Sequence, residues 1–205
     1  MDLVTLYTPF GSVFTFADCS LSLADGMIIG LILALCLCLS AYRRHSLFQK
    51  FSYVLLYIYL GALVSLTIPI ILPGGWDFSS ESAALAIHRI QFIPFTSSWE
   101  ILKNCVLIDN YREFWRLVGG NFVLLMPLGI LLPAIHRRFG TAQMVLTGLF
   151  ASLGIELLQL LGNILGGRII RTVEIDDIIL NVIGCMAAYA LYRMVHRAFG
   201  GKGKR

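Results

Sequence analysis

Residues 154–184 read GIELLQLLGNILGGRIIRTVEIDDIILNVIG, two strongly apolar runs joined by a short loop with glycines and arginines. The first run contains Glu156 and Gln159, and the second begins behind Asp176 and Asp177. A carboxylate at the centre of a membrane span costs about 2.5–3.5 kcal/mol on insertion scales, so an acidic residue in a span is a candidate functional residue. We therefore expect two antiparallel membrane-spanning helices that carry a polar site.

The composition is that of a membrane protein. Hydrophobic residues make up 58% of the 205 residues, charged residues make up 14%, and the mean hydropathy is +0.80. A soluble domain carries about 25% charged residues. The sequence therefore predicts an all-α integral membrane protein without a separate soluble domain.

Five apolar segments suit spans of roughly 20 residues, which predicts a bundle of about five transmembrane helices. The predicted spans are residues 23–42, 51–72, 119–135, 142–161 and 178–195. Residues 23–197 would form one transmembrane domain, preceded by an external interfacial or re-entrant segment (1–22) and followed by a basic cytoplasmic tail (198–205).

Basic residues are concentrated in one set of loops that contains no acidic residue, which the positive-inside rule places in the cytoplasm. The amino terminus is then outside and the carboxyl terminus inside. These basic residues are Arg43, Arg44, Lys50, Arg137, Arg138, Arg193, Arg197, Lys202, Lys204 and Arg205.

The longest loop, between the second and third spans, is then external. Ser97 and Glu100 have capping-box spacing, which predicts a helix with Ser97 as its N-cap that continues over residues 99–117. Its apolar residues recur at helical spacing, which is typical of an amphipathic helix on the membrane surface or over the bundle. Such a helix would bring Arg112 and Arg116 to the outer mouth of the third span.

Polar residues of the last three spans fall at similar depths. Asn121 is at the outer end of the third span, and Glu156 lies about 9 Å below the outer end of the fourth at 1.5 Å per residue. Gln159 shares the helix face of Glu156, and Asn181 shares that of Asp177. We predict an outer polar pocket with Arg112, Arg116 and Arg168 in support. Its candidate ligand-binding residues are Asn121, Glu156, Gln159, Arg171, Asp176, Asp177 and Asn181.

Structural roles compete with this prediction. Gln159 and Asn181 would hydrogen-bond across helices, and Glu156 would pair with Arg171 or Arg168. Asp176, like Glu174, would cap a helix start, where negative charge is favoured by the helix dipole. The acidic residues near 174–177 could hold a hard cation, but two or three carboxylates are a weak signal. We predict no metal site and no cofactor.

Four stretches, in order, resemble the VanZ-like membrane proteins, the family that includes the accessory protein of glycopeptide resistance associated with teicoplanin. Glu174 stands where an aspartate is usual, and the likeness covers about residues 74–193. The stretches are FIPF at 92–95 with Pro94; Asn121-Phe122 with MPLG at 126–129, including Pro127, and Pro133; Ser152, Glu156 and Gln159; and Arg171, Glu174, Asp176, Asp177, Asn181 and Gly184.

The resemblance implies a bacterial plasma-membrane protein of the cell envelope and lowered susceptibility to teicoplanin-type lipoglycopeptides. Our leading hypothesis is a non-catalytic protein whose outer pocket binds an amphiphile. The expected partners are a membrane lipid, a lipid-linked wall component or the lipoglycopeptide itself, and no nucleic acid; the oligomeric state stays open.

Two other functions remain open. One is a membrane-embedded enzyme acting on a lipid-linked precursor, with Glu156 or Asp177 as acid, base or metal ligand. No Ser/His or Cys/His arrangement, phosphate-binding glycine loop or His-rich motif supports it. The other is a proton-coupled transporter with Glu156 as carrier, which five spans without a repeat disfavour.

Overall fold

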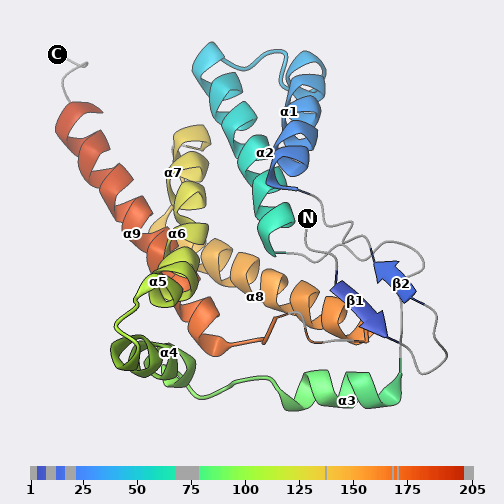
Figure 1. Cartoon of the computed structure of the whole chain (residues 1–205). Helices are drawn as coiled ribbons and strands as arrows, with labels where there is room; N and C mark the ends of the chain where they lie inside the picture. The colour runs from blue at the N-terminus through green and yellow to red at the C-terminus, as the bar shows by residue number, and fades with distance from the viewer. Residues whose placement is uncertain are drawn as a thin grey trace.

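The computed structural model describes residues 4–7, 13–16, 22–67, 79–136, 138–167, 169 and 171–200. Helices dominate these residues, as the sequence predicted (Figure 1). They are α1 (Leu23–Leu39), α2 (Leu47–Thr67), α3 (Ser80–His88), α4 (Thr96–Leu107), α5 (Arg112–Phe114), the π-helical turn η1 (Trp115–Gly119), α6 (Gly120–Leu124), α7 (Met126–Ile135), α8 (Thr141–Leu165) and α9 (Ile175–Gly200).

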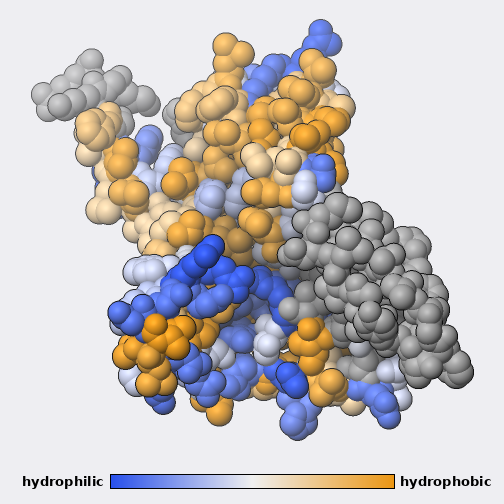
Figure 2. All heavy atoms as spheres, viewed as in Figure 1, coloured by the Kyte–Doolittle hydropathy of each residue, from blue (hydrophilic) through white to orange (hydrophobic). Residues whose placement is uncertain are grey.

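Four of the helical segments are long and apolar enough to cross a membrane, and α1, with 17 residues, is a shorter apolar helix. The four are Leu47–Thr67, Arg112–Ile135, Thr141–Leu165 and Ile175–Phe199. Large apolar side chains are exposed along these helices, and Figure 2 shows apolar surface over the end of the molecule formed by α1, α2 and α7. The all-α membrane fold is thus confirmed. The predicted end of the second span (68–72) and of the tail (201–205) lies outside the described residues.

The amino-terminal segment contains a β-hairpin. Strands β1 (Val4–Tyr7) and β2 (Val13–Phe16) pair antiparallel, with Val4 opposite Phe16. The sequence had indicated only an interfacial or re-entrant piece here, and its depth relative to the bilayer stays a prediction.

Glycines let α1 and α2 pack backbone against backbone. A Cβ added at Gly26 would overlap the Gly61 carbonyl, and one at Gly61 would overlap the Gly26 carbonyl. Small residues that allow such close approach are typical of helix pairs in membranes, where dispersion contacts replace the hydrophobic driving force.

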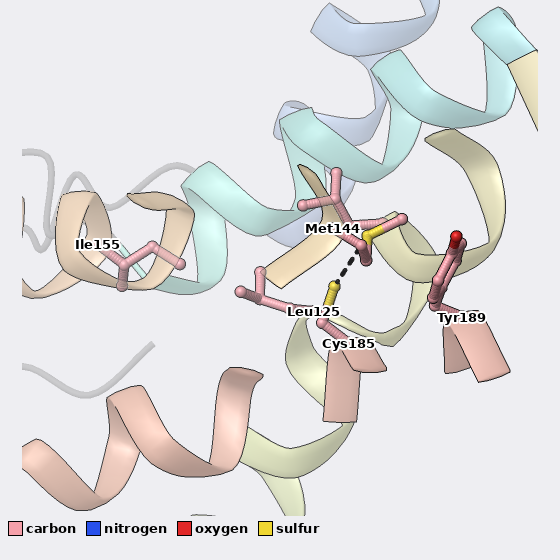
Figure 3. Packing of buried hydrophobic residues seen from close by; sticks show 6 residues of the cluster. Leu125, Met144, Ile155, Cys185 and Tyr189 are labelled. Atoms are coloured by element: carbon pink, nitrogen blue, oxygen red, sulfur yellow. Dashed lines mark hydrogen bonds between the residues drawn. The ribbon is translucent and has the colours of Figure 1, made fainter. Parts of the chain in front are cut away.

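The core lies where α7, α8 and α9 meet. Leu125, Met144, Cys185 and Tyr189 are buried there, and Cys185 Sγ lies 3.6 Å from Met144 Sδ (Figure 3). Tyr189 Oη–H donates to the Phe139 carbonyl at 2.8 Å, which fixes the α7–α8 connection against α9.

The third span is interrupted near Pro127, and proline is a common cause of such a break. α6 ends at Leu124 and α7 begins at Met126, with Pro127 in its first turn because proline has no N–H to continue the ladder. Tyr59 of α2 donates to the Leu124 carbonyl at 3.0 Å. A side chain of the second span therefore satisfies a carbonyl at the break.

The loop helix is shorter than predicted. α4 ends at Leu107, and Asp109 has a φ of 48°, a left-handed conformation that interrupts the helix. Arg112 N–H then donates to Asn110 Oδ1 at 3.1 Å, and the helical segment that is long and apolar enough to be the third span begins at Arg112, before the predicted start at residue 119. The predicted single helix over 99–117 is therefore wrong.

The ends of the molecule differ in character. The α1–α2 turn and the carboxyl-terminal end of α9 lie at one end, and α3 and α4 lie at the other, crossing the direction of α2 and α7 (Figure 1). Polar side chains gather over the α3–α5 end in Figure 2. Which end faces outward stays a prediction.

Candidate functional site

The segment before α4 is attached to the start of α9 by a parallel β-bridge. Gln91 N–H donates to the Val173 carbonyl at 2.9 Å, and Ile175 N–H donates to the Gln91 carbonyl at 3.0 Å. The bridge brings the FIPF motif, with the exposed Pro94 at its third position, beside the first turn of α9.

Asp176 joins this segment to α9. Phe95, the N-cap of α4, has a φ of 64° and no side-chain cap of its own. Its N–H donates to Asp176 Oδ1, while Ser98 donates to Asp176 Oδ2 through its N–H at 3.0 Å and its hydroxyl at 2.7 Å. The predicted capping box with Ser97 as N-cap is therefore wrong, because a carboxylate from a distant helix satisfies the first amides of α4.

Asp177 is half-buried and points to the third span. Asn121 of α6, itself buried, donates to Asp177 Oδ1 through its side-chain amide. This contact brings together two of the predicted site residues from different helices. Gly184, two turns further along α9, allows the approach, since a Cβ there would overlap the Phe122 carbonyl oxygen.

A cavity of about 320 Å³ opens between α4, the start of the third span and the start of α9. It holds two guanidinium-bearing residues, two carboxylate-bearing residues and the Asn121 amide. The lining residues are Ser98, Ile101, Arg116, Leu117, Val118, Asn121, Arg171, Thr172, Glu174, Asp177 and Leu180.

Glu156 and Gln159 lie behind this cavity, on a buried polar face of α8. Glu156 is 4% exposed, and its Oε2 accepts the Glu174 N–H at 3.3 Å. Gln159 is 2% exposed and donates to the Thr67 carbonyl of α2 at 3.0 Å. Asn181 donates to Ser152 Oγ at 2.9 Å. Neither Glu156 nor Gln159 nor Asn181 lines the cavity.

The interhelical hydrogen bonds considered as a structural alternative therefore exist for Gln159 and Asn181. Each of these amides also has a buried carbonyl oxygen that has no hydrogen-bond partner among the described residues. Glu156 forms no ion pair within 4.0 Å in the described part of the chain, whereas Arg116 and Glu113 pair at 2.8 Å.

The loop between α8 and α9 is held by Asn163. Its side-chain amide donates to the Arg171 carbonyl at 2.6 Å, and Arg171 N–H donates back to Asn163 Oδ1 at 3.5 Å. Asn163 was missed in the sequence, although it lies seven residues after Glu156 and so on the same helix face. Gln91 and Ser98 were also missed, and no local pattern marks them.

Burial raises the pKa of the Glu174 carboxyl above its usual value, and the nearby Asp176 raises it further. A hydrogen bond from the Ser97 side chain and the charge of Arg171 oppose this rise in pKa. The Ser97 side chain thus hydrogen-bonds to Glu174 and stabilises the ionised form of this cavity residue.

The other predicted cations lie differently. Arg116 lines the cavity and also pairs with Glu113, whereas Arg112 is exposed and is not a lining residue. Arg168 lies outside the described residues. Among the described residues, no group of three or more His, Cys, Asp or Glu side chains could hold a metal ion.

These features define a class: a multi-pass all-α membrane protein with a charged cavity between a loop helix and its last spans. The profile of the VanZ/LLP1 family matches residues 51–196, most of the chain and all of this cavity. The chain belongs to the VanZ/LLP1 family. No curated protein and no solved structure matches it.

Proposed function

We propose that this protein acts at the bacterial cell envelope by binding the polar headgroup of an amphiphile in the cavity between α4 and α9. The observation that carries the proposal is the lining: Arg116 and Arg171 beside Glu174 and Asp177, with the Asn121 amide between the helices. Four of these five residues belong to, or adjoin, the motifs that resemble the VanZ-like proteins.

The chemistry of the lining fits a headgroup of mixed charge. Guanidinium groups bind phosphate or carboxylate in a bidentate manner, and carboxylates accept from hydroxyl, amide and ammonium groups. A volume of about 320 Å³ is at the small end of ligand pockets, about 300–1,000 Å³. It suits one polar fragment of a larger amphiphile whose lipid part stays in the bilayer. We infer a lipid-linked wall component or a teicoplanin-type lipoglycopeptide as the ligand, and reduced susceptibility to the latter as the outcome.

The test measures binding by the full chain in lipid nanodiscs, with undecaprenyl diphosphate and teicoplanin as probes. We expect Arg171→Gln and Arg116→Gln each to weaken binding of one probe by tenfold or more. Arg112→Gln is the matched control, because this exposed arginine is four residues from Arg116 and does not line the cavity. Wild-type affinity in both cavity variants, or an equal loss in the control, would refute the proposal.

A cellular arm tests the phenotype. Expression of the wild type in a susceptible Gram-positive host is expected to raise the minimal inhibitory concentration of teicoplanin at least fourfold, and Arg171→Gln is expected to abolish the rise at equal membrane levels. Binding without any change in susceptibility would retain the pocket and remove the resistance role.

The same preparation distinguishes a binding protein from an enzyme. Glu156, the acid or base of the enzymatic hypothesis, accepts from the Glu174 backbone and lies behind the cavity wall. We infer that Glu156 positions the loop before α9 through this hydrogen bond. A new product by mass spectrometry after incubation with the lipid-linked probe and Mg²⁺, abolished by Asp177→Asn, would favour the enzyme instead.

A further inference from the structure

The turn between α1 and α2 lies at the end of the molecule opposite to α3 and α4 (Figure 1). Residues of this turn line a second cavity. Its volume is about 620 Å³, and it is lined by Ser40, Ala41, Arg43, Arg44 and His45. These residues precede the segment that matches the VanZ/LLP1 family, so the cavity is independent of the proposed function.

The cavity has positive charge without local compensation. Arg43 and Arg44 are exposed, and no Asp or Glu occurs from residue 26 to residue 76. Neither arginine forms an ion pair within 4.0 Å with any residue that the structure describes. An anion from outside the described chain is therefore the natural counter-charge for this pair.

Backbone donors add to the two guanidinium groups. The N–H groups of Ser40, Tyr42 and His45 donate to backbone carbonyls, whereas those of Ala41, Arg43 and Arg44 have no acceptor within the described residues. α2 begins directly afterwards, at Leu47, and the positive end of its helix dipole faces the turn. Ser46 Oγ accepts the Gln49 N–H at 3.3 Å and Gln49 Oε1 accepts the Ser46 N–H at 3.2 Å, so these two amides are not available to a ligand. Free N–H groups, a helix N-terminus and two arginines are the combination that binds phosphate.

An aromatic cluster packs the turn against α2. Tyr42 stacks on Tyr53 with ring centroids 4.0 Å apart, and the His45 ring lies edge-on to both at 5.3 and 5.6 Å. Tyr42 Oη also lies 3.1 Å from Tyr57 Oη. Tyrosines with polar tips and apolar bodies mark the membrane interface, where lipid phosphates are.

We propose that the α1–α2 turn is a binding site for a phosphate group, supplied by an anionic lipid headgroup. Arg43 and Arg44 hold the phosphate oxygens, and the free amides of the turn complete the site. Basic loop residues that only set topology would give no such site, since they need neither a cavity nor free N–H groups.

The test compares dissociation constants of dioleoylphosphatidylglycerol for the full chain in detergent micelles by native mass spectrometry. We expect the double variant Arg43→Gln/Arg44→Gln to bind it at least tenfold more weakly. The matched control is Arg138→Gln/Arg197→Gln, which removes the same charge from exposed positions elsewhere and is expected to stay within twofold. An equal loss in both variants, or no loss in the first, overturns the proposal.

Two further arms keep the test decisive if the glutamine variant misfolds. Arg43→Lys/Arg44→Lys retains the charge but not the bidentate geometry, and is expected to bind several-fold more weakly than wild type. With the wild type itself, dioleoylphosphatidylcholine is expected to bind at least tenfold more weakly; equal binding of both lipids overturns the proposal. Displacement by millimolar inorganic phosphate would identify free phosphate, rather than lipid, as the source of the same group.

Discussion

Replacing Asp176 by asparagine should release α4 from α9 while the bundle stays folded. The substitution preserves the shape of a side chain that is 3% exposed and changes one acceptor oxygen into an NH₂ donor. In the wild type, Phe95 N–H reaches Oδ1, and both donors of Ser98 reach Oδ2 at 3.0 and 2.7 Å. Whichever way the amide is oriented, at least one of the three donors then faces another donor.

The magnitude follows from the bonds that are lost. A hydrogen bond to a charged group contributes about 1.5–3 kcal/mol, and the remaining bonds weaken because the acceptor is neutral. We expect a cost of about 3 kcal/mol, which raises the fraction of undocked α4 on the order of 100-fold. The loss should be local, since Cys105 is the one fully buried residue recorded along α4.

Hydrogen–deuterium exchange with mass spectrometry measures this release. Faster exchange is expected over residues 95–107, with unchanged protection in α8 and in the rest of α9. Asp109→Asn is the matched control, because Asp109 is exposed at the other end of α4 and asparagine tolerates its left-handed backbone. Wild-type protection over residues 95–107 in Asp176→Asn would refute the assignment of this carboxylate as the cap of α4.

Three further predictions concern stability of the purified protein in detergent. Gly184→Ala puts a Cβ into the backbone of α6 and should cost about 1–3 kcal/mol by thermal unfolding, whereas Gly154→Ala, with open space around it, should be neutral or slightly stabilising; equal melting of the two variants would contradict the close packing. Tyr59→Phe removes the bond to the carbonyl at the α6–α7 break and should cost about 1 kcal/mol in denaturant unfolding, and an unchanged midpoint would show that this bond is not needed. The pKa of the Glu174 carboxyl is above the ordinary 4.5 in the folded protein, so the folded state holds this proton more tightly than the unfolded state does. The wild type should therefore lose stability relative to Glu174→Gln as the pH rises from 4.5 through the folded pKa. A stability difference that does not change with pH would exclude Glu174 as the source of this pH dependence.

The apolar spans followed from the sequence because they depend on local patterns, whereas the depth of the polar residues in the bilayer stays a prediction. Hydropathy marks each apolar run, and a rise of 1.5 Å per residue converts position into depth. Asn121 and Asp177 were assigned to the same outer layer on this ground alone, and the structure places them in contact. The face shared by Glu156 and Gln159 is likewise a consequence of helical spacing, and both side chains are buried.

Tertiary contacts decided what local patterns did not. Ser97 has a strong local capping signal, yet the N-cap of α4 is Phe95, two residues earlier, because Asp176, more than 70 residues away, satisfies the first amides of the helix. The bridge between Gln91 and the start of α9 has no sequence signal, since a backbone hydrogen bond is available to almost any residue. The wall of the cavity formed by α4 could therefore not be predicted.

Asp176 and Asp177 are neighbours in the sequence, and together they couple the docking of α4 to the cavity. Consecutive residues of an α-helix point about 100° apart, so Asp176 reaches α4 while Asp177 reaches α6 and the cavity. Ser98, whose donors hold Asp176, itself lines the cavity. A ligand that needs this wall binds only when α4 is docked, and its apparent affinity falls in proportion to the docked fraction. Asp176→Asn should therefore weaken ligand binding only in proportion to the undocked fraction of α4 that hydrogen exchange measures. Loss of the Arg171 side chain should weaken ligand binding while α4 stays docked. The two variants thus distinguish a residue that holds the cavity wall in place from a residue that binds the ligand.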